Sequence, residues 1–315
     1  MNFVYFGSSE FSLAVLQRLC QNHSAPDLIV SQPDKPKGRN LKISPTAVSH
    51  FAINKNIPLL RPANLKDKQF GAKLKRKRRD FFFVADYGKI LPAEIIKIPR
   101  QCALCLHPSL LPRWRGPAPI SRAILNGETT SGVTVFKINE RVDGGEIALQ
   151  KALPIKPDDT IISLTEKYAQ AGADLLAEAA RMILSGECRF TAQIENRATY
   201  APKFTKEEGA VNWSDTSRNI HNLIRATLGW PSAYTQINNL RIKIVDSAVN
   251  GRHSGKVEPG IILSIDDTGI SVACGDGILI IKRVKPQGKR EMSAHSFACG
   301  YRLKKGMRFD TALNK

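Results

Sequence analysis

The run Cys102-Ala103-Leu104-Cys105-Leu106 leads directly into His107-Pro108-Ser109-Leu110-Leu111-Pro112-Arg113-Trp114-Arg115-Gly116. The first part is typical of a buried strand, and the prolines of the second indicate a sharp turn at its end. A histidine there can move protons near neutral pH or donate a hydrogen bond to a developing oxyanion. Downstream, Arg141-Val142-Asp143-Gly144-Gly145 predicts a turn whose carboxylate can orient the imidazole. Two residues before the histidine, where a polar side chain would help, stands Cys105.

Outward from this stretch, the first half of the chain alternates short apolar runs with helical segments. This pattern predicts an α/β fold with a parallel, Rossmann-like sheet. Ligands of such sheets bind outside the carboxyl ends of the strands, so the turns after the strands are expected to share one rim. Gly7-Ser8-Ser9-Glu10-Phe11 has too few glycines for the dinucleotide fingerprint, which disfavours NAD. The strands are expected at 3–6, 28–30, 81–85, 102–106 and 133–136, and a long helix at 160–184.

The second half predicts a different architecture. Regular periodicity is lost over 189–206, which indicates a linker, and 213–227 predicts an amphipathic helix. Short strands separated by turn residues then predict a small antiparallel barrel of the OB type. We therefore expect a catalytic domain at 1–188, a linker at 189–206 and an OB-like domain at 207–315. The later strands are expected at 233–237, 240–245, 260–265, 269–274 and 277–284.

The charge is strongly positive and unevenly distributed. The chain carries a formal net charge of +19, of which +11 falls in residues 1–100, none in 101–200 and +8 in 201–315. A polyanionic partner, most plausibly nucleic acid, explains this distribution, and a generally basic surface is the alternative. The densest run, 73–79, follows a predicted helix and is interpreted as a solvated face or a helix C-terminus.

A second basic segment lies after the second predicted strand. It is expected to be a loop at the ligand-binding rim, where four cations are well placed to hold phosphates. A plain solvated loop is the alternative interpretation. The cations are Lys35, Lys37, Arg39 and Lys42.

The six cysteines are scattered through apolar or helical surroundings, a pattern that suits reduced thiols. Cys102 and Cys105 match C-x-x-C, but no second ligand pair with suitable spacing accompanies them, so no metal site is expected. No apolar run is long enough to span a bilayer, and the N-terminus has no signal-peptide pattern. We therefore expect a cytoplasmic protein with no membrane partner.

At His107-Pro108-Ser109-Leu110-Leu111-Pro112 the chain resembles the folate-dependent formyltransferases, which transfer a formyl group from 10-formyltetrahydrofolate to an amine. The resemblance extends over essentially the whole length. Residues 87–92 and 113–120, Trp230-Pro231 and Gly300-Tyr301-Arg302-Leu303 also carry it. The basic segment 32–39 and the C-terminal domain point to the members that formylate methionyl initiator tRNA for translation initiation. Their architecture is a Rossmann-like domain followed by an OB-type barrel that helps to hold the acceptor arm.

The resemblance implies roles for particular residues. The family's catalytic set is an asparagine, a histidine two residues on, and an aspartate in a D-x-G turn. In this chain the histidine is His107 and the aspartate is Asp143, while Cys105 stands at the asparagine position. We expect Lys35, Lys37, Arg39 and Lys42 to contact tRNA, with Arg39 the strongest single contact. The cosubstrate is 10-formyltetrahydrofolate, and the residues expected to bind it are Ser109, Leu110, Leu111, Pro112, Tyr87 and Gly88.

The reaction explains why position 105 matters. Attack of the methionyl amine on the formyl carbon gives a tetrahedral intermediate with negative charge on oxygen. His107 donates to that oxygen or shuttles the proton in this hypothesis, and Asp143 orients it. An asparagine amide would supply a further donor, whereas a thiol donates poorly. Cys105 can lower activity, be replaced by a backbone N–H or a water, or relay the formyl group covalently; we favour the first two.

Two further classes of function stay open. One is a formyltransferase for a nucleotide sugar or another small amine, which needs no basic barrel. The other is a tRNA-binding relative with weak or lost catalysis because of Cys105. Asp86 also departs from the small apolar residue usual in the family near the folate pocket, and it either weakens pterin binding or points to water. We expect the protein to act as a monomer.

Overall fold

The computed structural model describes residues 1–37, 42–251 and 257–311 and divides into two compact units. The N-terminal unit comprises Met1–Pro119, Thr130–Pro154 and Leu164–Ala201. The C-terminal unit comprises Ile120–Thr129, Ile155–Ser163 and Pro202–Lys315. The packing thus assigns two short segments from the first half of the chain to the second unit. The boundaries expected at 188 and 206 stay a prediction about functional domains.

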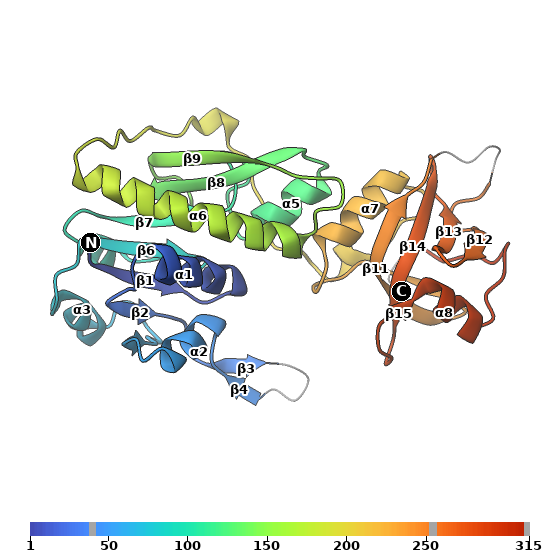
Figure 1. Cartoon of the computed structure of the whole chain (residues 1–315), viewed down its shortest axis with the longest axis horizontal. Helices are drawn as coiled ribbons and strands as arrows, with labels where there is room; N and C mark the ends of the chain where they lie inside the picture. Colours follow the sequence, from blue (N-terminus) through green and yellow to red (C-terminus); the bar gives the residue numbers. More distant parts are fainter. Residues whose placement is uncertain (38–41, 252–256, 312–315) are drawn as a thin grey trace. The chain divides into compact units, whose positions relative to one another are not determined.

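The N-terminal unit is built on a seven-stranded sheet with the order β5-β2-β1-β6-β7-β8-β9 (Figure 1). The first five of these strands run parallel, and β8 and β9 are antiparallel to their neighbours. This arrangement is Rossmann-like. The strands are β1 Phe3–Gly7, β2 Leu28–Val30, β5 Leu59–Leu60, β6 Phe81–Ala85, β7 Cys102–His107, β8 Thr130–Lys137 and β9 Ile147–Pro154.

The central strands are apolar on both faces because helices cover both sides. Every residue of β1 and β6 is buried, as expected for parallel strands with two covered faces. Aromatic rings from the two strands pack across the pair, with the Phe3 and Phe83 centroids 4.5 Å apart and those of Phe6 and Phe82 5.2 Å apart. The helices of this unit include α1 Glu10–Asn22, α2 Ala47–Asn54, α3 Lys68–Lys75, α4 Ala93–Ile96 and most of α6 Ile161–Leu184.

Helices α1 and α6 cover the same side of the sheet, as Figure 1 shows. They are joined by an ion pair of 2.8 Å between Arg18 Nη2 and Asp174 Oδ2. Helix α6 approaches β7 closely at Gly172, where a Cβ atom would lie 2.6 Å from a methyl carbon of Leu106. The glycine therefore sets the distance between the long helix and the strand that ends at His107.

Most expected strands of this unit are confirmed, and two expectations need correction. The strand expected at 133–136 is β8, but it pairs antiparallel to β7 and not within a parallel repeat. The loop expected around the basic segment is a hairpin, in which β3 Lys35–Lys37 pairs with β4 Lys42–Ser44.

The run 73–79 is a helix C-terminus, one of its two expected interpretations. Helix α3 ends at Lys75, and the buried Arg79 donates to the carbonyls of Leu74 and Lys77.

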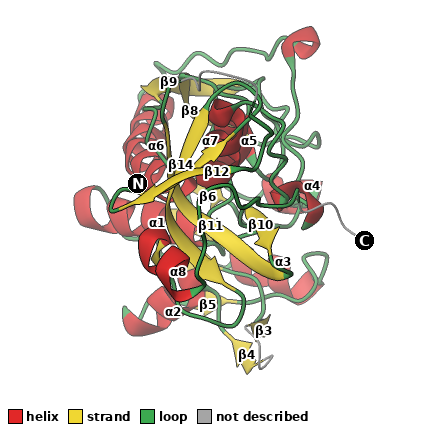
Figure 2. Ribbon diagram, turned by 90° about the vertical axis from the view of Figure 1, so that its right-hand side faces the viewer, coloured by secondary structure: helices red, strands yellow, loops and turns green. Residues whose placement is uncertain are grey.

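The C-terminal unit contains an antiparallel sheet with the order β10-β11-β14-β13-β12, and β15 pairs with β14. Its longest strands, β11 and β14, can be followed in Figure 2. Alternate residues such as Ile242 and Ile244 enter one hydrophobic core, where the Trp213 and Phe309 rings stack 5.6 Å apart. The expected OB-like strand pattern is thus present. The strands are β10 Tyr234–Ile237, β11 Leu240–Val249, β12 Ile262–Asp266, β13 Gly269–Ala273, β14 Ile278–Pro286 and β15 Met292–Ser293.

The helices of the C-terminal unit are shorter than the periodicity suggested. The helix expected at 213–227 begins at Ser217, because the Thr216 hydroxyl accepts a hydrogen bond from the Asn219 N–H and caps it. None of the helices in the described ranges is long and apolar enough to cross a membrane. This unit holds α7 Ser217–Ala226, α8 Ala294–Gly300 and most of α5 Pro119–Leu125.

Candidate active site

His107 is the last residue of β7 and is only 5% exposed. Its Nε2 atom lies 2.9 Å from the carbonyl oxygen of Trp114, in the turn that the strand enters. Because a carbonyl oxygen only accepts, Nε2 carries a proton and donates it to this bond. Nδ1 is therefore the ring nitrogen left to interact with a substrate.

Asp143 faces that nitrogen. Its Oδ2 lies 3.8 Å from His107 Nδ1, which is too long for a hydrogen bond but close enough for a strong charge interaction. The same oxygen accepts a hydrogen bond of 2.8 Å from the Gly116 N–H. The Asp143 carboxylate therefore lies beside Nδ1, where its negative charge can stabilise positive charge that develops on the ring during a reaction.

The turn that carries Asp143 is fixed by distant residues. Asp143 has a positive φ of 50°, and the Gln193 side-chain amide donates to the carbonyls of Asp143 and Gly145, both at 2.8 Å. Gln193 in turn accepts from the buried guanidinium of Arg115, which also forms a bidentate ion pair with Glu195. Sequence reasoning missed Gln193 and Arg115 because nothing in their local pattern points to the Asp143 turn.

The Ser109–Pro112 segment is held rigidly by neighbouring strands. The Ser109 hydroxyl donates to the Arg113 carbonyl at 2.6 Å, so it shapes the turn. The Thr134 hydroxyl, from β8, donates to the Ser109 carbonyl and accepts from the Leu111 N–H. The Leu111-Pro112 peptide is cis, and Gln150 of β9 donates to the Leu111 carbonyl at 2.7 Å. These hydrogen bonds therefore fix the position of the turn's backbone and of its two leucines.

Cys105 lies half-buried in β7, in register with Val84 of β6 and Phe136 of β8. Burial raises the pKa of its thiol well above the ordinary value, and the negative charges of Asp143 and Asp86 raise it further. The thiol is therefore neutral near pH 7 and a poor nucleophile. This argues against the covalent relay. The idea that Cys105 replaces a catalytic asparagine stays a prediction.

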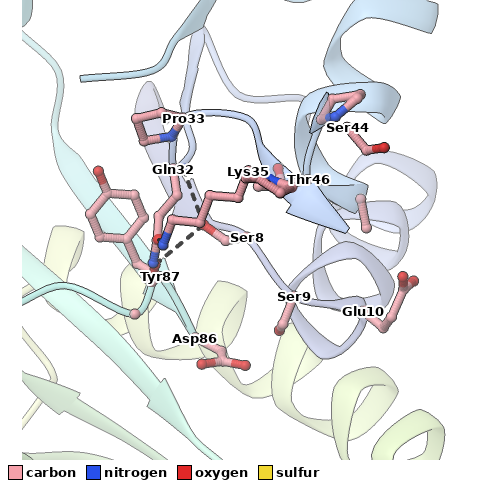
Figure 3. Close-up of a pocket in the computed structure, with 14 residues that line it drawn as sticks. Ser8, Ser9, Glu10, Gln32, Pro33, Lys35, Ser44, Thr46, Asp86 and Tyr87 are labelled. Carbon is pink, nitrogen blue, oxygen red and sulfur yellow. Dashed lines mark hydrogen bonds between the residues drawn. The ribbon is translucent and has the colours of Figure 1, made fainter. Parts of the chain in front are cut away.

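A cavity of about 460 Å³ opens where β1, β2 and β6 end (Figure 3). A small hydrogen-bond cluster forms one wall: the Ser8 hydroxyl and the Gln32 side-chain amide both donate to the Tyr87 carbonyl, at 3.2 and 2.7 Å. Lys35 Nζ donates to Gln32 Oε1 at 2.7 Å. The expectation that turns after several strands share one rim is thus confirmed for Ser8 and Tyr87. The carboxylates of Glu10 and Asp86 also line this cavity.

The residues expected to bind the cosubstrate do not share one pocket. Tyr87 and Gly88 line the cavity described above, but the Tyr87 ring is buried against Phe6, and burial raises the pKa of its hydroxyl to about 12. Only its backbone is available there. The turn at Ser109–Pro112, which we call the SLLP turn, contributes Leu110, Leu111 and Pro112 to the wall of a second cavity of about 520 Å³, opposite residues 196–199. Leu110, Leu111, Pro112, Arg113, Asn196, Arg197, Ala198 and Thr199 surround it.

Three of the basic residues expected to contact tRNA, Lys35, Lys37 and Lys42, lie on the β3–β4 hairpin. Lys35 is exposed, and Lys37 and Lys42 are paired in the hairpin register. Arg39 lies outside the described residues. A further basic surface, which we call the β11–β14 strip, lies on the outward side of the C-terminal sheet and was missed by the sequence analysis. It consists of Arg241, Lys243, Arg283 and Lys285.

Positively charged side chains lie close together in this strip. Lys243 and Lys285 are directly paired across the two strands. Burial lowers the pKa of Lys243, and the positive charges of Lys285 and Arg241 lower it further. Repulsion of this kind is relieved when an anion binds. In the part of the chain that the structure describes, no group of His, Cys, Asp or Glu side chains is arranged to hold a metal ion.

Comparison with known sequences matches both halves of the chain. The family model described as "Formyl transferase" matches residues 1–180, and "Formyl transferase, C-terminal domain" matches residues 203–302. A methionyl-tRNA formyltransferase of Synechococcus sp. is 40% identical over 323 residues, covering 100% of both chains. One from Acetivibrio thermocellus is 36% identical over 306 residues, covering 97% of this chain and 98% of its own length.

Comparison with solved structures supports the fold. An N-formyltransferase from Helicobacter canadensis, solved with folinic acid and dTDP-3-aminofucose, superposes with a TM-score of 0.66 at 22% identity. The match covers 89% of this chain and 98% of that one. HypX from Aquifex aeolicus, solved with tetrahydrofolic acid, gives a TM-score of 0.67 at 16% identity over 97% of this chain. This chain spans about half, 48%, of HypX.

Proposed function

We infer the function from the premise that this chain belongs to the formyl transferase family, which matches both its N- and C-terminal parts. It transfers the formyl group of 10-formyltetrahydrofolate to the α-amino group of methionyl initiator tRNA, a step in translation initiation. The observation that carries this conclusion is a sequence identity of 36–40% over nearly the whole chain to relatives that are all named methionyl-tRNA formyltransferase. Because the substrate is a charged tRNA, the expected compartment is the cytoplasm, and a monomer is the expected state.

The transfer has simple requirements. The amine nitrogen forms a bond to the formyl carbon while the bond from that carbon to N10 of the folate breaks. The acceptor begins as an ammonium group, so one proton leaves to solvent and a second ends on N10. Oxyanion charge develops on the formyl oxygen between these events, and a positioned donor near it lowers the barrier.

We assign the donor to His107. Its Nε2 is committed to the Trp114 carbonyl, so Nδ1 is the atom that can donate to the oxyanion or carry the proton toward N10. The Asp143 carboxylate lies 3.8 Å from Nδ1, where it stabilises positive charge that develops on the ring during the transfer, and it is itself fixed by the Gly116 N–H.

The cosubstrate 10-formyltetrahydrofolate supplies an activated formyl group. We propose that the SLLP turn and the Tyr87–Gly88 backbone contact it. The cavity at the SLLP turn combines leucine and proline side chains with the guanidinium groups of Arg113 and Arg197. Apolar walls with a few cations suit a flat aromatic system that ends in a carboxylate. The cavity lined by the Gly88 backbone would take the reacting end.

We propose that the β3–β4 hairpin and the β11–β14 strip hold the tRNA backbone. The cross-strand pairing of Lys243 with Lys285 supports a polyanionic partner for the strip, because a bound anion offsets the repulsion between two neighbouring cations. In the hairpin, Lys35 is exposed at the edge of the cavity that lies beside Asp86. Phosphate contacts at these places would set the register of the acceptor arm without reading its sequence.

One assay tests the function as a whole. The protein is incubated with 10-formyltetrahydrofolate and methionyl initiator tRNA, and both retention of the tRNA and formylation of its methionine are followed. We expect both for the wild type. We expect His107→Gln to lose about a hundredfold or more in kcat while retaining the tRNA, because an amide cannot carry a proton and the basic surfaces are unchanged.

The matched control is His50→Gln, a substitution of an exposed histidine in α2, which should leave both readouts unchanged. Retention without formylation by the wild type would support the non-catalytic alternative. Formylation of a small amine such as a nucleotide-linked amino sugar, with no tRNA retention, would support the other.

A further inference from the structure

Asp86 is an exposed carboxylate placed directly after the buried strand β6. It has a positive φ of 42°, a conformation that aspartate tolerates better than most residues, so the backbone turns away from the strand direction at this residue. In Figure 3 it stands apart from the cluster formed by Ser8, Gln32 and the Tyr87 carbonyl. Within the described ranges its carboxylate has no hydrogen-bond donor or cation as a partner.

The strand register brings Asp86 next to the catalytic pair. Val84 of β6 pairs with Cys105 of β7, and the two strands run parallel. Asp86 lies two residues beyond Val84, and His107 lies two residues beyond Cys105. Asp86 directly follows the last residue of β6 and His107 is the last residue of β7, so the two residues lie at the same edge of the sheet, at the ends of neighbouring strands about 4.8 Å apart. Asp143 approaches His107 from the opposite neighbour, after β8.

The negative charge of Asp86 acts on a side chain of the site. Burial raises the pKa of the Cys105 thiol, and the charges of Asp143 and Asp86 raise it further, so both carboxylates lie within electrostatic reach of this one side chain. The cavity at Asp86 also holds the exposed carboxylate of Glu10, while its cation, Lys35, is already bonded to Gln32. The Asp86 side of the cavity is therefore suited to a cation and unsuited to an anion.

The chemistry of the two substrates identifies that cation. A tRNA carries a phosphate on every nucleotide, and a folate carries glutamate carboxylates, so an unpaired carboxylate repels most of both. The protonated α-amine of the acceptor amino acid is the one cationic group that must enter the site. It must also come within bonding distance of the formyl carbon beside His107.

We propose that Asp86 binds the α-ammonium group of the aminoacyl acceptor and positions its nitrogen beside His107; this inference rests on the proposed function. The ammonium loses one proton to solvent before it attacks, and its second proton ends on N10, so Asp86 contributes to binding and alignment and not to the bonds that change. It is a positioning residue that selects an acceptor with a free amine.

Binding measurements test this proposal without any turnover. The ligands are methionyl initiator tRNA and the same tRNA carrying the α-hydroxy analogue of methionine, each measured at about pH 6, where an α-amine is protonated. We expect the wild type to bind the amine form about tenfold or more tightly, the value of a hydrogen bond to a charged group. Asp86→Asn, which keeps the shape and tolerates the positive φ, should bind both forms equally.

Asp86→Gly is the second variant, because glycine accepts a φ of 42° without strain, and it should also lose the discrimination. Glu94→Gln removes an equivalent exposed charge from α4, outside the cavity, and should keep it. In steady state, the Asp86 variants should raise KM for the acceptor and lower kcat/KM for it, while KM for the folate stays that of the wild type.

Equal binding of the two tRNAs by the wild type would overturn the proposal. So would retained discrimination in both Asp86 variants, or a raised KM confined to the folate, which would indicate that Asp86 contacts the cosubstrate. A wild type that discriminates but transfers no formyl group would contradict the proposed function and leave this inference standing. Failure of the two is therefore distinguishable.

Discussion

At the scale of single residues, the hydrogen bonds of His107 determine what the site can do. The Trp114 carbonyl fixes a proton on Nε2, and Nδ1 lies 3.8 Å from the Asp143 carboxylate. Nδ1 can therefore take a proton from the attacking amine and pass it toward N10, and the Asp143 charge stabilises the ring while it carries that proton.

This assignment predicts the effect of Asp143→Asn. The amide keeps the size of the side chain but removes the negative charge that stabilises the ring while it carries a proton during the transfer, so kcat should fall about a hundredfold or more. Binding of methionyl initiator tRNA, measured by filter retention, should be unchanged. Glu140→Gln, which removes an exposed charge three residues away, serves as the control. Full activity in Asp143→Asn would mean that the pair does not act together.

Cys105 makes a second prediction at this scale. Its neutral thiol donates poorly, whereas an asparagine amide offers two good donors at the same point of β7. We expect Cys105→Asn to raise kcat for formyl transfer about tenfold or more, since one oxyanion donor is worth a hundredfold or more where it has been removed. Cys102→Ala, on the same strand, is the control and should leave kcat unchanged. An inactive Cys105→Asn would refute the missing-donor hypothesis.

At the scale of elements, the sequence predicted the strands whose burial is continuous. β1 and β6 are buried at every residue, so their apolar runs were sufficient to find them. β9, at Ile147–Pro154, was missed because it is an edge strand with a mixed burial pattern. The antiparallel direction of β8 also left no trace in its residues, because apolar content does not record which way a strand runs.

The same limit applies to the site. His107 and Asp143 could be predicted because each lies in a local motif, and the structure brings them together. The contacts that fix them could not be predicted. Gln193 holds the Asp143 turn from 50 positions away in the chain, and no local pattern records such a distance. That Asp86 and His107 stand at the ends of neighbouring strands is likewise a property of the folded sheet.

The contact between α6 and β7 provides a prediction at this scale. Gly172→Ala should destabilise the protein by about 1–3 kcal/mol, because the new methyl group overlaps the buried Leu106 side chain. The kcat for formyl transfer should also fall, because Leu106 directly precedes His107 in β7. The control is Gly71→Ala in α3, where the nearest atom is 4.0 Å from the new Cβ, and it should be stabilising by about 1 kcal/mol.

Thermal unfolding measures both changes. Shortening the obstructing side chain supplies a further check: in a Leu106→Val background, the cost of Gly172→Ala should shrink, because the two substitutions are in contact and not additive. An additive pair would mean that the close approach of helix and strand does not limit the packing.

At the scale of the whole molecule, charge provides the argument. The net charge of +19 is concentrated in the first and last thirds of the chain, whereas the middle third, which carries His107 and Asp143, is neutral. The catalytic residues therefore lie in the neutral third of the sequence, and the basic residues that meet phosphates lie in other segments. Binding of the tRNA and chemistry on its amino acid are thus assigned to separate parts of the sequence, and they should be separable by mutation.

The β11–β14 strip allows that separation to be measured. Each phosphate contact releases counterions, so log K for tRNA falls linearly with log salt concentration. Lys243→Gln and Lys285→Gln should each weaken binding at low salt and reduce the slope by about 1. Lys97→Gln, an exposed lysine after α4, should change neither. At saturating tRNA, kcat of the strip variants should equal that of the wild type, because the His107–Asp143 pair is untouched. A lowered kcat with an unchanged salt slope would mean that the strip acts on the catalytic unit and does not hold phosphates.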